Sequence, residues 1–250
     1  LVIHGMPGGY DQGLLLRRSF PEHFDGVQTI AISRPGYLRT PVASGKTPEE
    51  QADLYAALLD ELKIERVIVE GASGGAPSAV QFALRHPQRT KALVLIAPVF
   101  EGWEGKGNET APPDSFLTQE NVIAWLAGDR LARRMAPQAD VHDEKQMHAM
   151  RALVKTSLPT EMRVEGMVND ARAFNKLDYA AWPLEQIAVP TLFLQGDKDM
   201  NVPPEATVAP AARIPGAELH IFAGADHLFM VSRANEMSDR IRQFTSRLTD

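Results

Sequence analysis

The stretch VIVEGASGGAPSAVQFALRH, residues 67–86, decides the fold, because a buried strand turns directly into a helix at a serine. The strand pattern covers residues 66–71 and the helical pattern residues 76–86. Gly71 to Gly75 fit G-x-S-x-G, a sharp turn in which small residues on both sides of Ser73 leave room for a strained backbone. The same letters also suit a plain glycine-rich turn or a phosphate loop, so the rest of the chain has to decide between them.

Several short runs are apolar almost throughout rather than alternating. Such strands are buried on both faces, which is typical of a parallel sheet covered by helices. The runs are residues 1–5, 27–33, 66–71, 91–99, 190–196 and 218–224. Helices are predicted between them, at 48–63 with a capping box from Thr47 to Glu50, at 76–86 and at 228–248. The alternation predicts an α/β fold with a doubly wound, mostly parallel sheet.

The alternation of strands and helices fails between residues 100 and 185. This stretch opens with a loop rich in Gly, Pro and charge and continues with helical patterns near 119–135, 140–156 and 160–176. Strand signals resume at residue 190, so we interpret the stretch as an insertion. We therefore predict a core of residues 1–99 and 186–250, with a helical cap at 100–185.

The composition excludes several classes of function. The chain has 250 residues, a formal net charge of −6 and no cysteine. The charge gives no reason to expect nucleic acid or an anionic membrane as a partner, and the missing thiols exclude disulfides and a cysteine nucleophile. No apolar run approaches the roughly 20 residues that span a bilayer. We expect a cytoplasmic protein, and the sequence does not predict its oligomeric state. Because Leu1 begins directly on a strand, we expect residues upstream of it.

A base and an acid follow the last two predicted strands. His227 comes directly after the strand at 218–224, and a neutral imidazole can take a serine proton and return it to a leaving group. The strand at 190–196 ends in Asp197 and Asp199. We choose Asp199 because it lies further into the loop, and Glu101 is the weaker substitute. The carboxyl ends of parallel strands gather at one edge of the sheet, which would bring these residues to Ser73.

An oxyanion site needs backbone donors next to the nucleophile. One is the N–H of Gly74, directly after Ser73, and the glycine-rich loop HGMPGG at residues 4–9 supplies the other, which we assign to Met6. His4 is expected to be a structural hydrogen-bonding residue rather than a second base. The order serine, acid, histidine along the chain is that of the nucleophile-elbow hydrolases.

At this point the chain resembles the α/β-hydrolase fold family with a helical cap. The matching pieces occur in family order and cover nearly the whole chain: HGMPGG, SRPGYLRTP (33–41), GASGG, GDKDMNVP and GADH. The resemblance and a serine at the elbow imply an acyl-enzyme mechanism on an ester, thioester or amide, with a carboxylesterase as the leading hypothesis and with no cofactor and no metal. Prolyl aminopeptidases, carbon–carbon hydrolases, perhydrolases and slow-turnover ligand receptors of the same family remain alternatives.

Two residues depart from the family pattern. Leu38 stands where a small residue often sits, and Glu70 interrupts an apolar strand three residues before Ser73. We interpret Glu70 as structural, although buried carboxylates also cluster at functional sites.

The cap is expected to line the substrate pocket. The predicted lining residues are Trp103, Trp125, Trp182, Met200 and Leu228. Most of the tryptophans also suit a role in the cap core. The basic residues Arg130, Arg133, Arg134 and Arg151 suit either an anionic substrate or, preferably, a solvated helix face.

Overall fold

A computed structural model describes residues 1–19, 26–100, 143–174 and 176–248. Its centre is a sheet of six strands, all parallel, in the order β2-β1-β3-β4-β5-β6. The strands are β1 (Val2–Ile3), β2 (Ala31–Ile32), β3 (Val67–Ala72), β4 (Thr90–Ile96), β5 (Thr191–Gly196) and β6 (Glu218–Phe222). Each lies within one of the predicted apolar runs or within one residue of it, so the prediction of a parallel sheet is confirmed.

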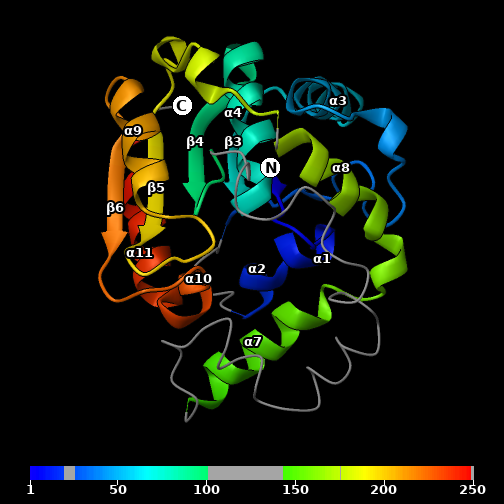
Figure 1. Cartoon of the computed structure of the whole chain (residues 1–250). Coiled ribbons are helices and arrows are strands. Elements are labelled where there is room, and N and C mark those ends of the chain that lie inside the picture. Colours follow the sequence, from blue (N-terminus) through cyan, green and yellow to red (C-terminus); the bar gives the residue numbers. More distant parts are fainter. Residues whose placement is uncertain (20–25, 101–142, 175, 249–250) are drawn as a thin grey trace.

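Helices cover both faces of this sheet (Figure 1). One face buries Leu93 and Leu95 against the apolar sides of α3 (Pro48–Glu61), α4 (Ala76–Arg85) and α9 (Glu205–Arg213). The other face buries Val94 and Ile96 against α11 (Ala234–Thr245). The alternation along β4 follows from the period of two in a strand, and its two apolar sides explain the continuous apolar run.

Several other described elements span only three to five residues. The α-helices are α1 (Tyr10–Gly13), α2 (Leu15–Ser19) and α10 (Phe229–Ser232). The 3-10 helices are η2 (Val42–Ser44), η3 (Ser73–Gly75), η4 (Pro87–Arg89), η5 (Thr160–Met162), η6 (Tyr179–Ala181) and η7 (Leu184–Gln186). The predicted helix at 228–248 is thus divided into α10 and α11, and the backbone leaves helical geometry at Arg233, with φ −122°.

The capping box at the start of α3 forms as predicted. The Thr47 hydroxyl accepts a hydrogen bond from the N–H of Glu50, and the Glu50 carboxylate accepts one from the N–H of Thr47, both at 3.2 Å. Pro48 takes the first helical position, where no N–H is needed. The sequence signal is therefore sufficient to fix where this helix begins.

Among the described residues between β4 and β5, two stretches form α-helices, namely α7 (Glu144–Lys155) and α8 (Val164–Phe174). They match two of the three helical patterns predicted for the insertion, whereas the third, at 119–135, lies outside the described residues. Residues 143–174 and 176–190 contain no strand. In Figure 1 the arrowheads of β4, β5 and β6 point toward the side of the molecule where α7 and α10 lie. The exact limits of a cap, 100–185, stay a prediction.

Glu70 on β3 has a partner that the sequence did not reveal. Both of its carboxylate oxygens accept hydrogen bonds from the Arg17 guanidinium of α2, at 2.9 and 2.7 Å. Burial alone would raise the pKa of Glu70, but the charge and hydrogen bonds of Arg17 outweigh it and hold that pKa below its usual value. The carboxylate therefore joins α2 to the sheet, in agreement with the structural interpretation.

Candidate active site

The predicted site residues all follow strands of the sheet. Ser73 directly follows β3, Asp199 lies after β5, His227 lies after β6, and the loop that contains Met6 follows β1. Parallel strands place these loops at one edge. The strand order puts β1 beside β3 and β5 beside β6, so the loop approaches the serine while the acid approaches the histidine.

Ser73 is held in a conformation that few side chains adopt. Its φ is +47°, in the left-handed region, at the point where β3 becomes η3 and then α4. The backbone of the β1 loop comes close to it: a Cβ added to Gly5 would lie 3.2 Å from the Ser73 Cβ. A Cβ on Gly75 would lie 2.5 Å from the carbonyl oxygen of Ile3. The glycines around the serine thus permit the contact between β1 and the turn.

His227 and Asp199 form a hydrogen-bonded pair. The imidazole Nδ1 lies 2.7 Å from Asp199 Oδ2, and the Asp199 side chain is fully buried. The carboxylate also accepts hydrogen bonds from the N–H groups of Asn201 and Val202, both at 2.9 Å on Oδ1. An acceptor so surrounded by donors is an ionised carboxylate, so the proton between it and the imidazole belongs to Nδ1. The lone pair of His227 then sits on Nε2.

A further buried residue supports the acid. Gln195, at the end of β5, donates through Nε2 to Asp199 Oδ2 and to the carbonyl of Val202, both at 3.0 Å. Its Oε1 accepts from the Thr207 hydroxyl at 3.0 Å. Sequence reasoning missed Gln195, although a polar side chain inside the apolar strand TLFLQG was the available signal. These hydrogen bonds hold the Asp199 side chain in place independently of its contact with His227.

The loop after β1 contains the N–H of Met6, the predicted second oxyanion donor. The N–H of Gly5 donates to the Gln12 Oε1 at 2.9 Å, and the N–H of Gly8 donates to the Gly5 carbonyl at 2.9 Å. In the part of the chain that the structure describes, the N–H of Met6, between them, has no protein acceptor. Gly74 is the second residue of the turn, and N–H groups at the start of a helix have no partner within it.

His4 precedes this loop in a buried polar cluster. Its Nδ1 donates to the Gly5 carbonyl at 2.7 Å, and its Nε2 accepts from the N–H of Arg34 at 2.9 Å. The Arg34 guanidinium makes a two-bond ion pair with Asp170 of α8, and the Tyr37 hydroxyl donates to the same carboxylate. Burial, followed by the charge of Arg34, holds the pKa of His4 well below its usual value. His4 is thus a neutral structural group, as expected.

The predicted lining residues lie in different places. Leu228 is buried against Met147 and Met150 of α7. Trp182 packs against the hydrophobic core on the side of the sheet that α3 and α4 cover. The Met200 side chain is 92% exposed. Trp103, Trp125 and the substitute acid Glu101 lie outside the described residues, as do Arg130, Arg133 and Arg134. Among the predicted lining residues that the structure describes, Leu228 is the one that is both buried and adjacent in the chain to a predicted catalytic residue, His227.

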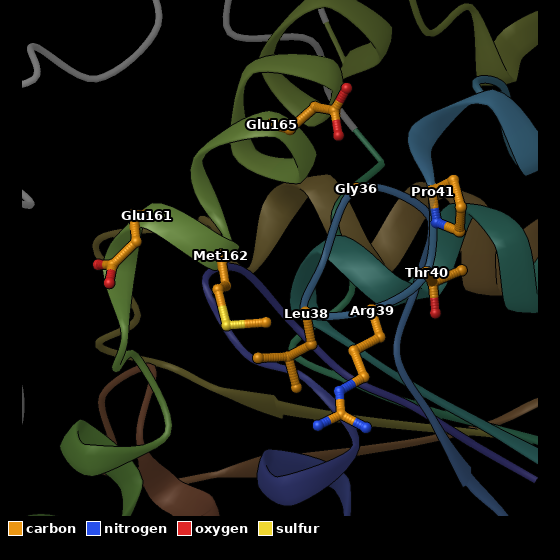
Figure 2. A pocket seen from close by; sticks show the side chains of 8 residues that line it. All are labelled: Gly36, Leu38, Arg39, Thr40, Pro41, Glu161, Met162 and Glu165. Atoms are coloured by element: carbon orange, nitrogen blue, oxygen red, sulfur yellow. The ribbon is translucent and has the colours of Figure 1, made fainter.

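A separate small pocket of about 180 Å³ lies where α8 begins. It is lined by Gly36, Leu38, Arg39, Thr40, Pro41, Glu161, Met162 and Glu165. Figure 2 shows the Leu38 and Met162 side chains pointing toward one another, with the two carboxylates directed away from each other. Leu38 has φ +55°, which explains why a small residue suits this position. None of the predicted catalytic residues lines this pocket.

Metal-ligand clusters and membrane-spanning helices are both absent from the described residues. No three His, Cys, Asp or Glu side chains among them are grouped so that they could hold a metal ion. Within the same residues, no helix combines the length and the apolar character needed to cross a membrane.

Comparison with known proteins identifies the family of this chain. The family model of the alpha/beta hydrolase fold matches residues 1–234. The chain belongs to the alpha/beta hydrolase fold family. A 2-hydroxy-6-oxononadienedioate/2-hydroxy-6-oxononatrienedioate hydrolase of Cupriavidus pinatubonensis is 30% identical over 91% of this chain and 79% of its own length.

Two solved structures are also similar to this chain. An alpha/beta hydrolase fold protein from Nakamurella multipartita is 29% identical, with a TM-score of 0.75 over 97% of this chain and 91% of that one. A structure of an N-acyl homoserine lactone degrading enzyme is 25% identical, with a TM-score of 0.67 over 97% of this chain and 91% of that one. The proteins similar to this chain are therefore named for quite different substrates.

Proposed function

We propose that the chain is a serine hydrolase that cleaves carboxylic esters through an acyl-enzyme on Ser73. The observation that carries the proposal is the His227–Asp199 pair, 2.7 Å apart, at the sheet edge where Ser73 stands at φ +47°. A strained serine, an imidazole with a free Nε2 and a carboxylate behind it are the parts that acyl transfer requires.

In the proposed mechanism Ser73 Oγ attacks the acyl carbon while His227 Nε2 takes its proton. The N–H groups of Met6 and Gly74 bind the oxyanion, and His227 then protonates the departing alcohol. Water, activated by the same Nε2, releases the acid and restores the serine. Asp199 stays ionised throughout and holds Nδ1–H, while Gln195 and the backbone of the acid loop keep the carboxylate in place.

A carbon–carbon hydrolase is the second candidate, because the curated relatives are named for 2-hydroxy-6-oxononadienedioate. That substrate is a dicarboxylate, and a site that selects it needs cations to pair with the carboxylates. The buried guanidiniums of Arg34 and Arg163 are already bonded to protein acceptors. These two cations are therefore not available to such a substrate, whereas Arg130, Arg133 and Arg134 of the insertion lie outside the described residues. A lactone, as in the name of one similar structure, is a cyclic ester.

Other members of the family use the same residues differently. Prolyl aminopeptidase, perhydrolase and slow-turnover receptor functions would each keep Ser73, His227 and Asp199, and no contact among the described residues favours any of them. We further propose that residues 100–185 form the cap over the site on a core of 1–99 and 186–250. The packing of Met147 and Met150 of α7 against Leu228, next to His227, supports this division.

One panel tests the proposal. Wild type and Ser73→Ala are assayed with p-nitrophenyl esters of increasing chain length, a thioester, a lactone, an aminoacyl arylamide and 2-hydroxy-6-oxononadienedioate. We expect multiple turnovers on the esters and a loss of about 10⁴–10⁶-fold in Ser73→Ala. Full ester hydrolysis by Ser73→Ala would refute the mechanism. Turnover of the dienedioate with none of the esters would favour the second candidate.

A further inference from the structure

Two side chains outside the proposed triad hold the loop that contains Met6. One is Gln12, on α1, which directly follows the loop; the other is Arg163, which immediately precedes α8. They bind the backbone on either side of Met6, at Gly5 and at Gly8. Neither was predicted from the sequence, and neither belongs to the nucleophile, base, acid or oxyanion donors of the proposed mechanism.

Gln12 fills the inside of the loop. Its Oε1 accepts the N–H of Gly5 at 2.9 Å, which removes that group as a competing donor. A Cβ on Gly8 would lie 2.4 Å from the Gln12 carboxamide, so a glycine there makes room for the side chain. Gln12 itself is fixed because its N–H donates to the Gly9 carbonyl at 3.0 Å.

Arg163 holds the other side of the loop from the insertion. The residue is 1% exposed, and its Nη1 donates to the Gly8 carbonyl at 2.6 Å. Its Nη2 donates to the Leu158 carbonyl at 2.7 Å and pairs with Asp11 at 3.0 Å. A Cβ on Gly9 would lie 2.7 Å from Nη1, so this second glycine makes room for the guanidinium. The charge is thus used inside the protein and is not available to a substrate.

We propose that Gln12 and Arg163 are positioning residues that aim the Met6 N–H at the oxyanion, and that Arg163 couples the insertion to this donor. The inference rests on the proposed function. A donor stabilises a developing charge only when it is held in place before the reaction, within about 0.5 Å of its working position. Gln12 holds the N–H of Gly5, one residue before Met6, and Arg163 holds the carbonyl of Gly8, two residues after it.

The kinetic test uses Gln12→Ala, Arg163→Met and Arg163→Lys with p-nitrophenyl butyrate. Loss of a whole oxyanion donor lowers kcat by about 100- to 1000-fold, so a loosened donor is expected to lower kcat by about 10- to 100-fold. KM should stay within about 3-fold, because the donor acts mainly on the transition state. Arg163→Lys keeps a cation that can reach one carbonyl, and its kcat should lie between those of wild type and Arg163→Met.

A double-mutant cycle separates positioning from general damage. Gly8→Ala should expel the Gln12 side chain and lower kcat as Gln12→Ala does, while the double variant should be no worse than Gln12→Ala alone. Independent effects would multiply instead. Phe244→Leu, a buried substitution in α11 remote from the loop, controls for stability and should leave kcat within about 2-fold.

The outcomes distinguish the two proposals. Loss of activity in Ser73→Ala together with wild-type kcat in Gln12→Ala and Arg163→Met would overturn the positioning role and leave the proposed function standing. The positioning role would also be overturned if the variants raised KM without changing kcat. It would be overturned as well if the effects of Gly8→Ala and Gln12→Ala on kcat multiplied in the double variant. Unchanged activity of Ser73→Ala would overturn the proposed function and the inference with it.

Discussion

Replacing Asp170 by Asn should lower the free energy of unfolding by more than the loss of an exposed ion pair does. The Asp170 carboxylate accepts two hydrogen bonds from Arg34, at 2.7 and 2.5 Å, and one from the Tyr37 hydroxyl at 2.5 Å. The side chains of Arg34 and Asp170 are 1% and 2% exposed. Asparagine removes the charge and turns one acceptor into an N–H₂ that faces the guanidinium, so the buried cation of Arg34 is left uncompensated.

The size of the effect follows from this burial. Breaking a buried pair by neutralising one partner costs about 3–5 kcal/mol, a large share of the 5–15 kcal/mol by which a domain is typically stable. For a chain of this length about 1 kcal/mol shifts the melting temperature by about 2–4 °C, so a drop of about 6–20 °C is expected. Urea unfolding, followed by circular dichroism, gives the free energy of unfolding directly.

The chain offers a matched control. Arg85 and Asp53 form the same two-bond pair, at 2.9 and 2.6 Å, but their side chains are 42% and 47% exposed. Asp53→Asn should therefore cost less than about 1 kcal/mol. Adding Arg34→Met to Asp170→Asn should recover part of the loss, because the unpaired charge is removed. The reasoning is wrong if the Asp170 and Asp53 variants lose the same free energy, or if the double variant is less stable than Asp170→Asn.

Three further predictions concern single groups. The pKa of His4 in the folded protein lies below the ordinary value of 6.5, so its contribution to stability is complete above that pH and is lost as the pH falls. The free energy of unfolding should drop by about 1.4 kcal/mol per pH unit below 6.5. A free energy of unfolding that stays constant between pH 7.5 and 5.5 would contradict this. Glu70→Gln should cost about 3 kcal/mol in urea unfolding yet leave kcat within about 3-fold, whereas a large loss of kcat would assign Glu70 to the chemistry. Gln195→Leu should lower kcat about 10-fold with little change in KM, because Asp199 loses a donor, and unchanged steady-state kinetics would exclude a supporting role.

The sequence predicts the sheet well because strands that are apolar along their whole length must be buried on both faces, and few arrangements other than a parallel sheet covered by helices achieve this. The period of two in β4 sends Leu93 to one face and Val94 to the other, and both faces must be covered. The strand order was not predicted, but the carboxyl ends of parallel strands share one edge of the sheet, so the places of Ser73, Asp199 and His227 at that edge follow from the strand assignments alone. The choice between Asp197 and Asp199 was a matter of loop reach, and the structure places Asp199 against the imidazole.

Side-chain partners were beyond the sequence because they depend on residues far apart in the chain. Arg17 meets Glu70 across 53 positions, and Arg34 meets Asp170 across 136. The break at Arg233 was likewise invisible, because the helical pattern of 228–248 continues through it. Local signals fix elements such as the α3 capping box, whereas pairings between elements appear only once the fold has been assembled.

The contacts of the insertion indicate how this fold could tie substrate selection to catalysis. From one side, Asp170 of α8 holds Arg34, whose guanidinium donates to the His4 carbonyl at 3.0 Å, and Arg163 holds Gly8. From the other side, α7 packs on Leu228, next to His227. The same inserted segment therefore contacts the loop of the proposed oxyanion donor and the loop of the proposed base. A substitution in α7 or α8 that shifts these contacts should change kcat as well as substrate preference, because both loops are held by residues that the parallel sheet itself does not supply.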